Sequence, residues 1–168
     1  MANGDNVFNR SFAGGGVARG PLHLVRVNEH DHRDWELLTP FARPRGTVVN
    51  PPLVDPSRRI VVAYDSGNAC LAGFRFAGPG RFERLWEQAF GASNHFLLYA
   101  DTGEIAVNDF RDEAEHVVVL DVETGHERGR VAIGSPVQSV LFQAPGFGRD
   151  LYVCTFTTLA RVFVDEAT

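Results

Sequence analysis

Four polar residues at the start of apolar runs have side chains that could bind a small ligand. Their amide and imidazole groups both donate and accept hydrogen bonds, which is the chemistry of recognition rather than of bond cleavage. They occupy comparable positions in successive segments of the chain, so a fold that arranges these segments around one axis would gather them. The alternative is that they hydrogen-bond buried water or backbone and serve only the fold. The predicted ligand-binding residues are Asn50, Asn94, His95 and Gln138.

A serine nucleophile is the strongest catalytic alternative. Ser135 or Ser139 could be activated by His95 and by an acid such as Asp101. The sequence has no Gly-x-Ser-x-Gly elbow, however, and Ser135 stands in what reads as an ordinary turn before a strand. All 16 cationic residues are arginine, which excludes Schiff-base catalysis by lysine and a P-loop lysine. We therefore predict no catalytic residue.

One short stretch of histidines suggests a metal site. His30 and His32 flank Asp31, and alternate residues of a strand point the same way, so with Glu29 they could share a cation. The stretch has the composition of a polar turn, however, and no further ligands are identifiable for it. We therefore predict no metal site, and the sequence leaves the cofactor unknown.

Charge and composition narrow the range of partners and compartments. The 168-residue chain has a net charge of −5 and its arginines are scattered, which argues against nucleic-acid binding. No apolar stretch reaches the roughly 18 residues of a membrane span, and the N-terminus lacks the apolar core of a signal peptide. Cys70 and Cys154 match neither a metal-ligand spacing nor a disulfide framework. We expect a reduced, cytoplasmic protein that binds neither nucleic acid nor membrane.

Short β-branched runs separated by turn residues dominate the chain from about residue 47 onward. Arg59–Ala63 is one such run, and Asp65–Asn68 is the turn that follows it. The first strands of successive units centre on Leu53, Leu97 and Leu141, which are 44 and 44 residues apart. A period of about 45 residues with four strands per unit is the signature of β-propeller blades. The predicted fold class is all-β, with antiparallel four-stranded meanders stacked as part of a β-propeller.

The period divides one structural domain into repeated units. We predict a flexible N-terminal arm and a partial blade, followed by two complete blades and an incomplete blade that lacks its fourth strand. The ranges are 1–20 for the arm, 21–46 for the partial blade, 47–91 and 92–134 for the complete blades, and 135–168 for the incomplete blade.

One stretch carries two conflicting signals. In Arg81–Gly91 the apolar residues fall at 82, 85, 86, 89 and 90, which is the spacing of an amphipathic helix. The repeat instead places the fourth strand of a blade here, with Trp86 packed between blades. We favour the strand because the repeat is the longer-range signal.

The sequence Leu-Asp-Val-Glu-Thr-Gly at 120–125 resembles a blade turn of the quinoprotein-type and YVTN-type β-propellers. In those families the Asp and the Gly make the hairpin that joins the two outer strands, and Asp121 and Gly125 match them. The resemblance extends over residues 47 to 165 at the level of blades. Two features depart from it: Glu127–Val131 carries no Trp, and the adjacent cysteines and acidic residues that hold quinone and calcium have no counterpart. The resemblance implies the fold without the cofactor.

The number of blades bears on function. A propeller needs about four to eight blades to close, and this chain supplies about three and a half. An unclosed array exposes apolar faces and strand edges, which favours association. We predict a non-catalytic binding or interaction module that completes its ring by self-association as a homodimer, or as part of a longer chain. In the homodimer a partner's N-terminal segment, such as Val7–Phe12, would supply the missing strand. The alternative is a fragment of a propeller enzyme, of the quinoprotein dehydrogenase or lactonase kind, with a cofactor or metal in its channel.

Overall fold

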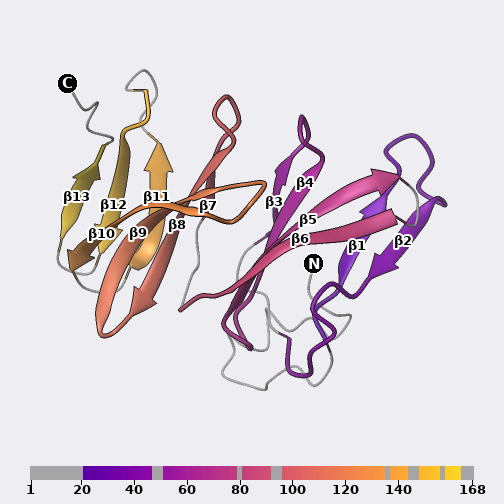
Figure 1. Ribbon diagram of the computed structural model, residues 1–168, viewed down its shortest axis with the longest axis horizontal. Helices are drawn as coiled ribbons and strands as arrows, with labels where there is room; N and C mark the ends of the chain where they lie inside the picture. Colours follow the sequence, from indigo (N-terminus) through magenta and orange to yellow (C-terminus); the bar gives the residue numbers. More distant parts are fainter. Residues whose placement is uncertain are drawn as a thin grey trace.

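Antiparallel β-structure makes up most of the described part of the chain in the computed structural model. The described residues are 21–46, 51–78, 81–91, 96–134, 137–143, 148–155 and 158–163, and they contain thirteen strands and no helix. The strands form four antiparallel sheets that follow one another along the chain (Figure 1).

Each sheet is a meander whose neighbouring strands are also neighbours in sequence. The first sheet has two strands, the second and third have four each, and the fourth has three. The strands are β1 (Leu24–Val27) and β2 (Trp35–Leu38); β3 (Leu53–Asp55), β4 (Ile60–Asp65), β5 (Cys70–Gly78) and β6 (Arg81–Ala89); β7 (Phe96–Tyr99), β8 (Glu104–Arg111), β9 (Ala114–Asp121) and β10 (Glu127–Gly134); and β11 (Val137–Gln143), β12 (Leu151–Thr155) and β13 (Leu159–Val162).

The second sheet is covered on both of its faces. All six residues of β4 are buried, which is the pattern of a strand enclosed on both sides. Because successive side chains of a strand point to opposite faces, Val61 and Ala63 pack against the first sheet, whereas Ile60 and Val62 pack against the third. A nearly continuous apolar strand therefore holds two neighbouring sheets at once.

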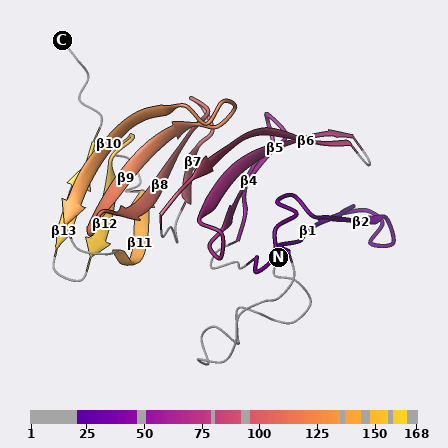
Figure 2. The ribbon, with the colours of Figure 1, turned by 60° about the horizontal axis from the view of Figure 1, so that its bottom comes forward.

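A third core lies between the third and fourth sheets, where Ala106 and Val117 meet Leu151 and Val153. Three cores thus join four sheets into one stack, whose curved sheets lie side by side (Figure 2). A meander that cannot cover both of its own faces, and stacks on its neighbours instead, is the unit of a β-propeller. The predicted fold class is confirmed.

The stretch 81–89 is a strand, as the repeat predicts, and its helix-like spacing has a local cause. β6 pairs with β5, but the register shifts between Gly73 and Phe74. Trp86 pairs with Gly73, and Leu85 is left as the extra residue of a β-bulge. The bulge allows two consecutive apolar residues in one strand, and that spacing imitates a helical period.

Aspartates open several of the turns between strands. Asp55 and Asp65 are fully buried, yet each accepts hydrogen bonds from backbone N–H groups of its own turn. Asp121 opens the turn between β9 and β10 in the same way. A side chain that accepts these bonds stabilises the turn locally. The turn predicted at Asp65–Asn68 is confirmed.

Candidate functional site

The predicted ligand-binding residues fall largely outside the described part of the chain. Asn50, Asn94 and His95 are not among the described residues. Gln138 lies in β11, but its side chain is not described. Their role in ligand binding stays a prediction. The described residues form two other candidate surfaces, an exposed apolar face and a groove.

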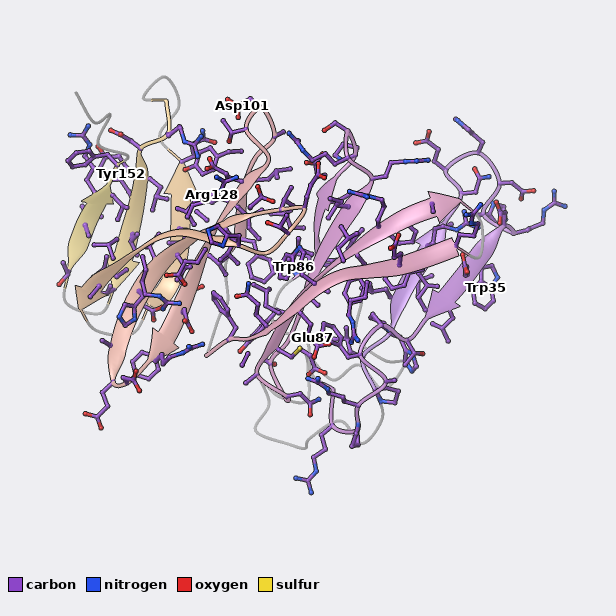
Figure 3. All side chains as sticks on the ribbon, viewed as in Figure 1. Trp35, Trp86, Glu87, Asp101, Arg128 and Tyr152 are labelled. Atoms are coloured by element: carbon purple, nitrogen blue, oxygen red, sulfur yellow. The ribbon has the colours of Figure 1, made fainter. Side chains whose placement is uncertain are left out.

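An apolar surface covers the outer side of the first sheet, at one end of the stack. Leu24 and Leu38 of this sheet pack inward on the second sheet, so the alternate residues point away from it. Trp35 is 60% exposed and Leu37 is 53% exposed. Figure 3 shows Trp35 beside β2, at the opposite end of the molecule from Tyr152. We call this surface the apolar end face; it consists of Val25, Val27, Trp35 and Leu37.

A groove opens between the third and fourth sheets, beside β13. Its volume is about 500 Å³, within the range of sites that hold small ligands or peptide side chains. Val131 of β10 pairs with Val117, which packs toward the fourth sheet, so Val131 faces that sheet too. No strand of the described fourth sheet covers Val131, and it is 44% exposed. The apolar lining of the groove consists of Val117, Val119, Val131, Leu151, Val162 and Phe163.

Three arginines also line the groove, and each is already paired with a carboxylate. The pairs are Arg128 with Asp121 at 2.7 Å, Arg130 with Asp109 at 2.8 Å, and Arg149 with Glu104. Because these charges are neutralised within the chain, the groove does not favour an anionic ligand. Its remaining chemistry is apolar contact together with hydrogen bonding at the neighbouring strand edge.

The carboxylate of Asp121 is held in its ionised form. Burial would raise its pKa, but hydrogen bonds from the guanidinium of Arg128, from the backbone and hydroxyl of Thr124 and from the backbone of Glu123 outweigh burial. Together they lower the pKa of Asp121 to about 2. A carboxylate fixed in this way stabilises its turn and is a poor general base near neutral pH.

The turn that Asp121 opens also contacts the second sheet. The indole N–H of Trp86 donates a hydrogen bond of 2.9 Å to the backbone oxygen of Val122. Gly125 has a φ of 71°, and a Cβ added there would lie 2.6 Å from Cδ2 of Trp86. Glycine is therefore required both by the backbone conformation and by the indole. The prediction that Trp86 packs between blades is confirmed.

The turn between β7 and β8 is held from both neighbouring sheets by arginine. Arg58 donates a hydrogen bond of 2.8 Å to the backbone oxygen of Ala100. From the other side, Arg149 donates to the hydroxyl of Thr102 at 2.9 Å and lies 4.9 Å from the ring centroid of Tyr99. Polar contacts thus supplement the apolar cores in fixing one sheet against the next.

Buried carboxylates in the third sheet have partners that explain their burial. Glu115 accepts a hydrogen bond of 3.1 Å from the amide of Asn108. Asp109 accepts one of 2.7 Å from the backbone N–H of Gly91 and pairs with Arg130. Such paired groups stabilise the sheet, whereas unpaired charges at this depth would cost several kcal/mol.

The histidine stretch lies in the exposed loop between β1 and β2. His30 and Glu29 approach each other at 3.2 Å, and both side chains are largely exposed. Among the described residues, no group of three or more His, Cys, Asp or Glu side chains is placed to hold a metal ion. Nor does the described part of the chain contain a helix long and apolar enough to span a membrane.

Comparisons with known proteins identify few similar chains. No protein-family model matches the chain, and no curated protein matches it. Five chains of solved structures match, one being the β-propeller domain of the Trilobed protease from Pyrococcus furiosus, which is described as having an open velcro topology. The two are 11% identical with a TM-score of 0.36, over 85% of this chain and 53% of that one. This chain thus spans about half the length of that structure.

Sequence reasoning did not identify the apolar end face or the groove. A signal for the first was present, because Leu24-Val25 and Leu37-Leu38 place apolar residues on both faces of a short hairpin. That pattern is typical of a sheet covered on both sides. The groove has no local signal, since its lining comes from strands that are distant in sequence.

Proposed function

We propose that this chain is a non-catalytic interaction module of the β-propeller type, whose end sheets bind further blades. The observation that carries the proposal is the apolar end face. Apolar sheet faces inside the stack, such as the two faces of β4, are covered by a neighbouring sheet. Covering four half-exposed apolar side chains contributes roughly 1 kcal/mol each, which favours association at this end of the stack.

A second copy of the chain is the partner that we propose. The opposite end of the stack also exposes apolar side chains, with Leu159 at 69% and Phe163 at 56%. A head-to-tail contact would cover both ends at once, and two copies related by a two-fold axis contain that contact twice. Two copies supply eight sheets, which is within the range of about four to eight blades in a closed propeller. If the blades instead came from the remainder of a longer chain, they would cover the same faces.

Two further features support the finer points of this proposal. Asp121 and Gly125 make the turn between the two outer strands of the third sheet, which supports blades of the quinoprotein or YVTN type. Cys70 and Cys154 are both free thiols, which supports a reducing compartment such as the cytoplasm.

Solution mass tests the proposal directly. Light scattering of the chain over a concentration series should give a dimer, and Trp35→Glu should shift it to the monomer, because a carboxylate would be buried in the contact. Ala132→Glu, at an exposed position of β10, is the matched control and should leave the dimer intact. If Trp35→Glu and the control had the same mass, the apolar end face would not be the interface.

A further inference from the structure

Among the described residues, the fourth sheet has one strand fewer than the second and third sheets. The second and third sheets continue to fourth strands, β6 and β10, whereas β13 is the last strand of the described fourth sheet. This difference changes the exposure of residues on the preceding sheet, which the fourth strand and its turn would cover. Trp86 of β6 is 8% exposed under the β9–β10 turn, while Val131 of β10 is 44% exposed.

The edge of β13 and the groove beside it together indicate what kind of segment could bind there. The open side of an edge strand presents backbone N–H and C=O groups in the spacing of a strand. Val131 and Val162 beside it are apolar, and the arginines of the rim are already paired. An extended segment with apolar side chains on one side fits both features, as in recognition by strand addition.

We propose that the segment Val7–Phe12 of a second copy adds to the edge of β13 as the fourth strand of the fourth sheet. This inference rests on the head-to-tail pairing proposed above. In an extended conformation Phe8, Arg10 and Phe12 fall on one side, where the two aromatic side chains would enter the groove, while Val7, Asn9 and Ser11 fall on the other. Both aromatic residues of the segment thus share the side that the groove would cover, and two of the three residues opposite them are polar.

The positions of the sheets favour a second copy over the same molecule. The first and fourth sheets lie at opposite ends of the stack (Figures 1 and 2), so the segment that precedes Pro21 starts far from its own β13. In a head-to-tail pair, by contrast, the first sheet of one copy lies against the fourth sheet of its partner. Eight residues separate Phe12 from Pro21 and extend up to about 26 Å at ~3.3 Å per residue, which is enough to cross the roughly 10 Å between stacked sheets.

Amide hydrogen exchange in β13 tests the inference separately from the pairing. The test variant is the double substitution Phe8→Asp/Phe12→Asp, and its control is Asn9→Asp/Ser11→Asp, which adds the same charge to the opposite side. Isotope-labelled wild-type chain is mixed with an excess of either unlabelled variant, and exchange is read for Leu159–Val162 of the labelled chain. The outward-facing amides of β13 should exchange at least about tenfold faster beside the test variant than beside the control.

The other outcomes overturn the inference in distinguishable ways. A dimer whose β13 exchange is the same beside both variants leaves the proposed function standing and rules out the added strand. Slow exchange in the mixture but fast exchange in labelled test variant assigns the strand to the same molecule, which contradicts the second copy as its source. A monomeric wild-type chain overturns the pairing and the added strand together. If the test variant weakens the dimer, exchange is read at a concentration that restores the dimer mass.

Discussion

The indole N–H of Trp86 in the second sheet donates a hydrogen bond of 2.9 Å to the backbone oxygen of Val122 in the third. The bond joins the outermost strand of one blade to the outer turn of the next. Gly125 closes the same turn against the face of the indole. The turn that resembles a known blade motif is therefore also a contact between blades. Its glycine is needed both for the turn conformation and for the close approach of the indole.

Gly125→Ala should destabilise the protein by about 2–4 kcal/mol, because the new methyl group meets the indole and the backbone has positive φ. Gly129→Ala in the neighbouring strand is the matched control, since a Cβ there has no atom within 4 Å. Denaturant unfolding of both variants measures the difference. Equal stabilities for the two variants would show that Trp86 does not lie against the turn.

Asp121 should make stability depend on pH in the acid range. Its folded pKa of about 2 lies below the ordinary value, so its contribution is complete above pH ~4 and is lost as the pH falls through 2. Asp121→Asn should lower the free energy of unfolding by roughly 2 kcal/mol at pH 7. It should also make the free energy of unfolding depend less on pH between pH 4 and 2. Unfolding curves at several pH values check this, with Asp101→Asn in an exposed turn as the control.

The two thiols should differ in reactivity. Cys70 is buried, and its burial, with the nearby Glu87 carboxylate, raises its pKa to about 11 against the opposing effect of Arg43. Only a small fraction of the Cys70 thiol is ionised at pH 8, so an alkylating reagent should label Cys154 at least about tenfold faster than Cys70. Mass spectrometry of the labelled peptides measures both rates. Rapid labelling of Cys70 in Cys154→Ser would contradict the buried environment.

Labelling of Cys154 should also report the proposed pairing. Cys154 pairs with the exposed Leu159 in β12–β13, and the alternate residues Val153 and Ala160 pack inward, so Cys154 faces outward. A second copy on that face would cover the thiol. The labelling rate should fall as protein concentration rises, and Trp35→Glu should abolish this dependence. A rate independent of concentration would place Cys154 outside the interface.

The sequence predicts the strands and turns, which depend on local residue patterns. It does not predict surfaces that form between strands distant in sequence. The strands and the turns at Asp55 and Asp65 follow from β-branched runs and from side chains that bind their own backbone. The strand at 81–89 needed the repeat, because the bulge at Leu85 disguises its period. Val131 is exposed because no strand of the described part of the neighbouring sheet covers it, so no pattern within β10 could predict its exposure.

The association state of the 168-residue chain tests the central claim most directly. Light scattering at concentrations from about 1 to 100 µM should give a mass twice the 18.5 kDa of a single chain, falling toward one chain only on dilution. A mass of 18.5 kDa throughout this range, with cooperative unfolding, would contradict the completion of the ring by a second copy.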